Sequence, residues 1–418
     1  MKYNIIVIGA GAAGLIAAGR AAELGAKVLI LEKMNTEGKK LLITGKGRCN
    51  ITNEASQAEY FKRIHPNGRF LKHAFSEFFN TDIVQLLNKQ GLETKSERGG
   101  RIFPASDSSR DVLKALLDWN SKLGVRIQLN SKLEAILVEN NQIKGVDYQI
   151  NGRRESLQTE KLIICTGGAS YPATGSNGDA YKIIKSLGHK IEPIRPALVP
   201  LETEGGLAEK LMGLSLKNVT ASLWVNGKKQ AEEFGEMLFA HFGLSGPIIL
   251  TLSRLAVDEL RKNNKVEVSI DLKPALDDQK LDARLLRDLN ENGKKKIGTI
   301  FKLWLPGKLV PEMMELAEID AEKECHQVAA KERKKIKTLM KDFRFKVTSA
   351  RSFKEAIITA GGVNTSEIDS KTMESKIIKN LYFAGEVIDL DADTGGYNLQ
   401  IAYSTAWLAA QSAAKKEV

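Results

Sequence analysis

Hydrophobic residues recur with two different spacings along this chain, and the changes of spacing predict its organisation. The chain opens with the apolar run 3–8, a glycine-rich stretch, an alanine-rich segment that ends at Leu24, and a second apolar run over 27–32. Short β-branched runs predict buried strands, and the alanine-rich segment between them predicts a helix. Strand, tight turn, helix and strand in this order form one βαβ unit with a parallel pair of strands.

The pattern changes after this unit. Leu113, Leu116 and Leu123 fall on one face of a helix that we expect over about 109–123. From Val125 onward, short alternating segments separated by Asn-rich turns at 140–141 and 151–152 predict antiparallel hairpins. We therefore expect a small meander inserted into a parallel sheet, followed by the apolar strand 161–168.

Prolines at 193, 196 and 200 mark the start of an insertion. Strand-like segments follow to about residue 272, and 275–342 is helical in pattern and rich in lysine, before apolar strands and a final helix from Asn398 return. The predicted organisation is a discontinuous domain over 1–190 and 346–418, an inserted β domain over 191–274, and an inserted helical, lysine-rich subdomain over 275–345.

The first glycines have the spacing of a dinucleotide-binding loop. Gly9, Gly11 and Gly14 form G-x-G-x-x-G directly after a strand and at the start of a helix, with Ala12 and Ala13 between them. In this context the first glycine permits the tight turn, the second lets the backbone approach a pyrophosphate, and the third lets helix and strand pack closely. The amides of the helix N-terminus then face the phosphates.

Glu32 lies 18 positions after Gly14, at the end of the second strand. A carboxylate there accepts hydrogen bonds from ribose hydroxyls and repels a 2′-phosphate, so the ligand is FAD or NAD. A second glycine-rich stretch runs from Gly385 and Glu386 to the segment 393–400, which leads into the last helix. FAD is long enough to need a second anchor of this kind, and the arrangement favours FAD.

The amino-acid composition narrows the class of protein further. The 418 residues are 43% hydrophobic and 27% charged, and no apolar run reaches 18 residues, as expected of a globular protein without a membrane span. The cysteines Cys49, Cys165 and Cys325 lie far apart, which excludes a disulfide scaffold and a dithiol relay. The five histidines show no metal-ligand spacing, so we expect no metal site. We expect a cytoplasmic protein.

The net charge of +11 raises the question of an anionic partner. Residues 323–346 hold nine Lys or Arg against three Asp or Glu. No RNA-binding module accompanies them, so the sequence favours a solvated helix face over a nucleic-acid surface. An RNA-associated flavoprotein that uses this segment is one alternative function, and a non-catalytic flavin-binding protein is another. The sequence does not indicate an oligomeric state.

Several long motifs in one order cover nearly the whole chain. They are VIGAGAAGL at 7–15, LLITGKGRCNITN at 41–53, ERGGRIFP at 97–104, CTGGASYPATGSNGDAY at 165–181, PALVPL at 196–201, HFGLSGP at 241–247 and TMESKIIKNLYFAGEVIDLDADTGGYNLQ at 372–400. In these motifs the chain resembles the bacterial BaiN-like flavoproteins, also called the aminoacetone-oxidase-like family of NAD(P)/FAD-dependent oxidoreductases.

The resemblance implies an α/β fold with a Rossmann-type, glutathione-reductase-like FAD domain built from both ends of the chain, and an inserted β-barrel-like plus helical domain. With the glycine loop and Glu32, the implied FAD-binding residues are Lys33, Thr44, Gly45, Gly47, Arg48, Cys49, Asn50, Leu133, Thr166, Gly167, Gly168, Gly385, Glu386, Asp393, Gly396, Tyr397, Asn398, Leu399 and Gln400.

The resemblance also implies a redox enzyme for a small organic substrate, either an NAD(P)H-dependent reductase or an oxidase of an aminoacetone-type amine. Flavin carries such chemistry, so the protein supplies positioning, electrostatics and exclusion of water. Our candidates for catalytic roles are His241 as proton donor, Tyr171 facing the cofactor, and Arg48 opposite an anionic flavin or substrate. No second G-x-G-x-x-G follows a strand, so an NAD(P)H donor would dock transiently at the substrate face.

Overall fold

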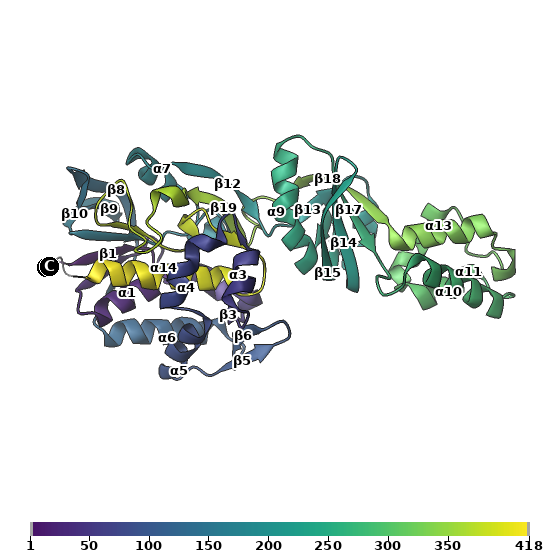
Figure 1. Ribbon diagram of the computed structural model, residues 1–418, viewed down its shortest axis with the longest axis horizontal. Helices are drawn as coiled ribbons and strands as arrows, with labels where there is room; N and C mark the ends of the chain where they lie inside the picture. Colours follow the sequence, from purple (N-terminus) through teal and green to yellow (C-terminus); the bar gives the residue numbers. More distant parts are fainter. Residues whose placement is uncertain (1–2, 416–418) are drawn as a thin grey trace. The chain divides into compact units, whose positions relative to one another are not determined.

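The computed structural model describes residues 3–415, which form two compact units (Figure 1). The first unit contains the residues up to Pro196 and those from Phe353 onward, and the second is Ala197–Ser352. Each unit has its own hydrophobic core. Both ends of the chain therefore build one unit, and the middle builds the other.

A parallel five-stranded sheet forms the centre of the first unit. Its order is β20 (Leu381–Phe383), β11 (Lys161–Ile164), β1 (Ile5–Ile8), β2 (Val28–Leu31) and β7 (Arg126–Gln128). All residues of β1 and β2 are buried, which explains their continuous apolar sequence. Helix α1 (Ala12–Glu23) joins these two strands and packs against the last helix, α14 (Tyr397–Ala414) (Figure 1). The predicted βαβ unit is confirmed.

Smaller elements surround this sheet. The predicted meander is β8 (Ser131–Glu139), β9 (Gln142–Ile150) and β10 (Arg153–Gln158), and the turn residues Asn140 and Asn141 have φ of 51° and 55°, as a tight hairpin requires. The predicted amphipathic helix is α6 (Ser109–Lys122). The remaining elements of this unit are α2 (Lys39–Ile43), β3 (Thr52–Asn53), α3 (Gln57–Arg63), β4 (Ile64–His65), α4 (Lys72–Glu77), α5 (Asn80–Lys89), β5 (Thr94–Glu97), β6 (Arg101–Pro104), α7 (Asp179–Ser186), β12 (Ile191–Ala197), β19 (Ile358–Val363) and β21 (Asp391–Ala392).

The second unit is a closed six-stranded barrel with a helical extension. The strands in barrel order are β13 (Leu201–Thr203), β16 (Gly243–Ser245), β15 (Lys228–Ala240), β14 (Ser215–Val225), β17 (Val266–Asp271) and β18 (Phe343–Ala350). The helices are α8 (Leu207–Lys210), α9 (Pro247–Arg261), α10 (Asp278–Glu291), α11 (Ile297–Trp304), α12 (Val310–Ala317) and α13 (Ala330–Lys341). The predicted fold class, a Rossmann-type domain with an inserted barrel and helices, is confirmed.

Strand β18 closes the barrel, although it follows the helices in the chain. It pairs with β17 on one side and with β13 on the other, and it runs through residues 345 and 346, where the sequence pattern suggested a boundary. The unit border lies later, between Ser352 and Phe353. A strand with long-range partners gives no local signal of the domain to which it belongs.

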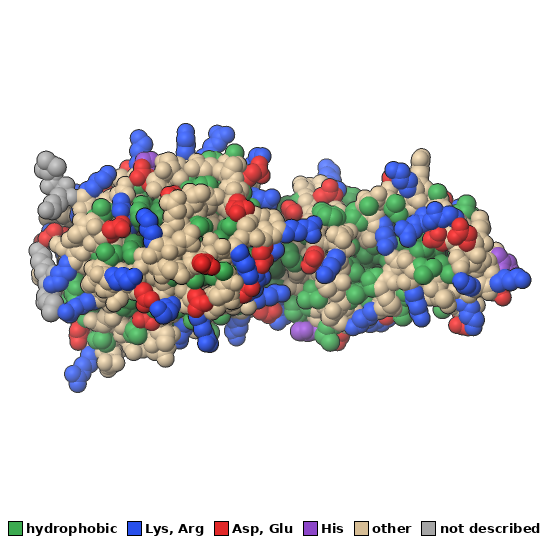
Figure 2. All heavy atoms as spheres, turned by 90° about the horizontal axis from the view of Figure 1, so that it is seen from below, with side chains coloured by type: hydrophobic (Ala, Val, Ile, Leu, Met, Phe, Trp, Pro, Cys, Tyr) green, Lys and Arg blue, Asp and Glu red, His purple; other side chains and the backbone are tan. Residues whose placement is uncertain are grey.

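The basic segment 323–346 is largely paired with carboxylates. Seven of its nine basic side chains form ion pairs: Lys323 with Glu332, Arg333 with Asp282, Lys335 with Glu318, Lys337 with Asp278, Lys341 with Asp271, Arg344 with Glu267 and Asp342, and Lys346 with Glu204. On the face shown in Figure 2, basic and acidic side chains are intermixed. This pairing supports a solvated helix face.

Within residues 3–415, none of the helices combines the length and the apolarity that crossing a lipid bilayer would require.

Candidate functional site

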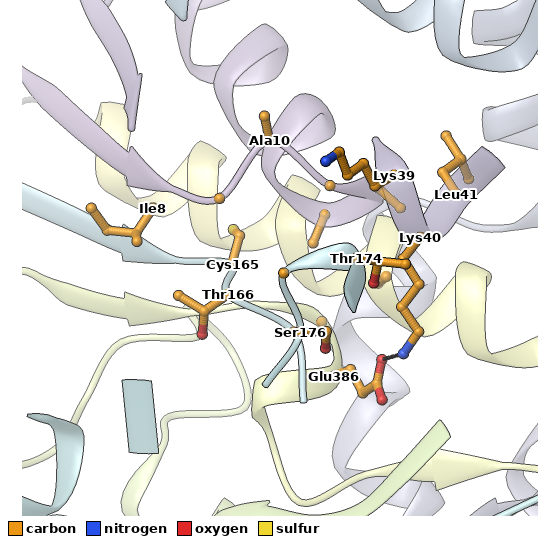
Figure 3. A pocket seen from close by; sticks show the side chains of 18 of the residues that line it. Ile8, Ala10, Lys39, Lys40, Leu41, Cys165, Thr166, Thr174, Ser176 and Glu386 are labelled. Atoms are coloured by element: carbon orange, nitrogen blue, oxygen red, sulfur yellow. Dashed lines mark hydrogen bonds and ion pairs between the residues drawn. The ribbon is translucent and has the colours of Figure 1, made fainter. Parts of the chain in front are cut away.

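A cavity of about 1400 Å³, including its open mouth, lies in the first unit (Figure 3). Residues that directly follow the parallel strands line it: Gly9 after β1, Glu32 after β2, Cys165 after β11 and Ala384 after β20. In open α/β sheets, ligands bind outside the carboxyl ends of the strands. The cavity therefore has the position expected of a binding site.

The three glycines of the first loop have different surroundings. A Cβ on Gly9, whose φ is +99°, would lie 2.6 Å from the carbonyl oxygen of Cys165, and a Cβ on Gly14 would lie 1.8 Å from the carbonyl oxygen of Gly9. A Cβ on Gly11 would have no described protein atom within 4 Å. Gly9 and Gly14 thus serve close packing, whereas Gly11 leaves space in the cavity for a ligand.

Glu32 is 9% exposed and is held by the backbone. Its Oε2 accepts a hydrogen bond from the amide of Ala10 at 2.7 Å, and its Oε1 accepts one from the amide of Met34 at 2.8 Å. Burial raises the pKa of Glu32, and these two hydrogen bonds oppose the rise. Each carboxylate oxygen keeps a second lone pair, which fits the acceptance of ribose hydroxyls.

Glu32→Gln is expected to weaken FAD binding about tenfold, because a glutamine has one acceptor oxygen and its NH₂ group must face one of the two amides. Titration of the apoprotein with FAD, followed by fluorescence quenching, measures the dissociation constant. Glu37→Gln is the matched control, since Glu37 does not line the cavity. Equal dissociation constants for Glu32→Gln and the wild type would contradict this role.

The second glycine segment meets the first across the cavity. Gly385 and Glu386 line it, as do Asn398 and Leu399 in the first turn of α14. The Asn398 side chain fixes this turn: its Oδ1 accepts from the amide of Ala392 at 2.8 Å and its Nδ2 donates to the carbonyl of Ala392 at 2.7 Å. The N-terminus of an 18-residue helix therefore opens at the cavity and favours negative charge there.

Lys39 and Lys40 line the cavity and were missed by the sequence analysis. Lys40 Nζ donates to Glu386 Oε2 at 2.5 Å (Figure 3). It also donates to Ser170 Oγ at 2.5 Å. Glu386 Oε1 in turn accepts from Ser170 Oγ at 2.9 Å and from the amide of Thr359 at 2.8 Å. The two lysines follow Gly38 in a segment without a strand or a long helix, so only their place in the fold reveals them.

Two polar atoms of the cavity wall have no partner in the described structure. They are Thr166 Oγ1 and Ser176 Oγ, both buried. Together with the open space at Gly11, these hydroxyls fit a ligand rich in hydrogen-bonding groups. The residues present thus fit FAD.

The structure brings many of the predicted cofactor residues together. Those that line the cavity are Gly9, Gly11, Ala12, Ala13, Glu32, Lys33, Thr44, Leu133, Thr166, Gly167, Gly385, Glu386, Asn398 and Leu399. Those outside its lining are Gly14, Gly45, Gly47, Arg48, Cys49, Asn50, Gly168, Asp393, Gly396, Tyr397 and Gln400. Two of the latter contact Thr52 of β3: Gln400 Oε1 accepts from Thr52 Oγ1 at 2.7 Å, and a Cβ on Gly396 would lie 2.5 Å from the carbonyl oxygen of Thr52.

The three catalytic candidates lie outside the cavity lining. Arg48 pairs with Glu97 and Asp107 and stacks on Phe103, with its guanidinium carbon 4.1 Å from the ring centroid. Tyr171 is partly buried, and its amide donates to the carbonyl of Phe353 at 2.9 Å. His241 is exposed in the turn between β15 and β16 of the second unit. Their catalytic roles stay predictions.

Two buried cysteines lie at or near the cavity: Cys165 lines it, and Cys49 is a neighbour of Thr44, which lines it. Cys49 is fully buried, and burial raises the pKa of its thiol to about 12, while Cys165 has its pKa raised by burial as well. Neither thiol is ionised at neutral pH, so neither is an activated nucleophile. No cluster of three His, Cys, Asp or Glu side chains that could hold a metal ion occurs within 3–415.

Hydrogen bonds link Ser375, His189 and Glu367, which are the residue types of a hydrolase triad. None of the three lines the cavity. Ser375 and His189 are buried, and Ser375 Oγ accepts from the amides of Ile377 and Ile378. Burial lowers the pKa of His189, which stays neutral at neutral pH. We interpret these three hydrogen-bonded residues as structural.

Comparison with known proteins places the chain in a family. Residues 3–412 match the family described as HI0933-like protein Rossmann domain. A 3-dehydro-bile acid delta(4,6)-reductase from Clostridium scindens is 31% identical over 99% of both chains, and a ribosomal RNA dihydrouridine synthase from Escherichia coli is 31% identical over 98% of both chains. Among solved structures, the 3-ketosteroid delta1-dehydrogenase from Sterolibacterium denitrificans shares the fold, with a TM-score of 0.51, 13% identity and 99% of each chain covered.

The predicted resemblance to BaiN-like flavoproteins is thereby confirmed, as is the predicted class, an FAD-dependent oxidoreductase. The chain belongs to the HI0933-like Rossmann family.

Proposed function

We propose that this oxidoreductase reduces a carbon–carbon double bond conjugated to a carbonyl group in a small organic molecule, with NAD(P)H as electron donor. The observation that carries the proposal is the identity of 31%, over almost the whole of both chains, with a protein named as a delta(4,6)-reductase of a 3-dehydro-bile acid. In the net reaction, NAD(P)H and a proton are consumed, the double bond is saturated, and NAD(P)⁺ is released.

In this proposal the cofactor supplies the redox chemistry, and the protein binds and orients the cofactor. FAD, when bound, supplies the two-electron redox chemistry. The N-terminus of α1 would hold the diphosphate, Glu32 would orient the ribose, and the N-terminus of α14 would stabilise negative charge near the other half of the cofactor.

The proton that completes the reduction needs a donor, for which His241 and Tyr171 remain our candidates. Burial, and to a smaller extent the charge of Glu355, raises the pKa of Tyr171, so its phenol keeps its proton at neutral pH. A protonated phenol can donate, and an imidazole is the side chain most often used for proton transfer.

A second candidate substrate is a uridine of ribosomal RNA. Two relatives, from Escherichia coli and Haemophilus influenzae, are named ribosomal RNA dihydrouridine synthases and are 31% identical to this chain over 98% of it. Uridine also contains a double bond conjugated to a carbonyl, so the same redox chemistry would serve. Most basic side chains of the segment 323–346 are paired with carboxylates, which disfavours this segment as a binding surface for RNA phosphates.

Anaerobic spectroscopy of the FAD-loaded protein tests the proposal. We expect NADH or NADPH to bleach the flavin absorbance rapidly, an enone or dienone acid to restore it, and air to restore it slowly. Bleaching by small amines with rapid reoxidation in air would instead identify an oxidase. A flavin that neither nicotinamide nor amine bleaches would indicate a non-catalytic flavin-binding protein.

The RNA arm uses the same protein with unmodified ribosomal RNA and NAD(P)H. Mass spectrometry of the digested nucleosides then measures dihydrouridine. If dihydrouridine forms while enones fail to reoxidise the flavin, the small-molecule proposal is wrong and the RNA candidate is correct.

A further inference from the structure

The cavity wall carries four lysines, and three of them are already paired. Lys33 Nζ lies 2.9 Å from Asp179 Oδ2 and 2.7 Å from Asn177 Oδ1, and Lys40 Nζ lies 2.5 Å from Glu386 Oε2. Lys132 Nζ lies 3.0 Å from Glu134 Oε1. These carboxylates cancel the charge of their lysines, so none of the three pairs offers net positive charge to a ligand.

Lys39 differs from these three lysines. Among the described residues that line the cavity, it is the lysine without an ion pair to a carboxylate. It is only partly exposed. An ammonium group carries three donors, which a neighbouring acceptor in the cavity would satisfy.

Lys39 stands beside the first glycine loop. The residue before it, Gly38, donates its amide to the carbonyl of Ala10 at 2.9 Å, which holds the start of α2 against the loop. In Figure 3 the Lys39 side chain extends toward the loop that carries Ala10, whereas Lys40 extends away to Glu386. Adjacent lysines thus serve different ends of the cavity.

We propose that Lys39 is the counter-charge for the diphosphate of FAD. The N-terminus of α1 contributes roughly half a positive charge, which is less than the negative charge that a diphosphate brings. An unpaired ammonium group beside the same loop supplies the remainder through charge-assisted hydrogen bonds. Lys39 is therefore a cofactor-positioning residue, and the inference is independent of the substrate proposed above.

The test variant is Lys39→Met, and Lys39→Arg is the conservative variant that keeps the charge. The control is Lys89→Met, which removes the same charge from an exposed site on α5 outside the cavity. Titration of each apoprotein gives the dissociation constants for FAD and for ADP, which has the diphosphate but no flavin. We expect Lys39→Met to weaken both ligands about 10- to 100-fold. Lys39→Arg and Lys89→Met should stay within about threefold of the wild type.

Three results would overturn the proposal. The first is an ADP dissociation constant unchanged in Lys39→Met. The second is a loss in Lys39→Arg as large as that in Lys39→Met, which would indicate side-chain shape and not charge. The third is an equal loss in Lys89→Met, which would indicate the general field of a basic protein. Circular dichroism and melting of each apoprotein show whether the variants fold, so misfolding is separable from lost binding.

Discussion

Gly11→Val is expected to yield a folded protein that no longer retains FAD. A Cβ at this position has no described protein atom within 4 Å, so we expect the polypeptide to tolerate a side chain here. The isopropyl group would instead occupy the space where the backbone approaches the cofactor diphosphate. We expect FAD affinity to fall at least about 100-fold, equivalent to about 2.7 kcal/mol. The purified variant should be colourless, with the far-ultraviolet circular dichroism of the wild-type apoprotein.

Gly206→Val is the control for this substitution. Gly206 has a φ of −86° and an equally open Cβ position, and it belongs to the second unit. It should purify yellow with wild-type FAD content. A yellow Gly11→Val protein with wild-type affinity would show that the cofactor does not approach this loop.

Gly14→Ala is expected to damage the fold itself. The added methyl carbon would lie 1.8 Å from the carbonyl oxygen of Gly9 and 3.5 Å from Cys165 Cβ. Backbone atoms cannot rotate away as a side chain can, so α1 and β1 must separate. We expect a loss of about 3 kcal/mol or more in the free energy of unfolding. For a unit of this size that corresponds to a melting temperature lower by roughly 6–12 °C.

Thermal melting of the apoprotein measures this effect without interference from FAD binding, which would itself stabilise the fold. Gly206→Ala is the control and should melt within about 2 °C of the wild type, as expected of a surface substitution. A Gly14→Ala protein with an unchanged melting temperature would show that helix and strand have room to separate at no cost.

Much of the first unit was predictable because its signals are local. The runs of β1 and β2 are continuous and apolar since both strands are buried on both faces, and the Asn-rich turns of the meander need residues that tolerate positive φ. Glu32 was found by its distance from the glycine loop, which the length of one βαβ unit sets.

Other features of the site have no local signal. Lys39 and Lys40 occur in a polar segment that resembles any surface loop, and Ser176 is an ordinary hydroxyl residue until the fold buries its Oγ beside the cavity. Arg48, flanked by glycine in sequence, pairs with Glu97 and Asp107, which belong to other segments of the chain. Contacts of this kind join segments that are distant in the sequence. They depend on the tertiary fold and cannot be derived from the spacing of residues along the chain.

The amino-acid order alone determined the βαβ unit and the two glycine segments, because these depend on short-range spacing of apolar residues, glycines and one carboxylate. It also indicated the family, because several long motifs occur in one order along the chain. Only the tertiary structure decided which glycine makes room for a ligand and which makes room for the backbone, which lysines are neutralised, and that β18 closes the barrel. Those outcomes depend on which distant atoms come within a few ångströms of one another, and packing of the whole chain sets these distances.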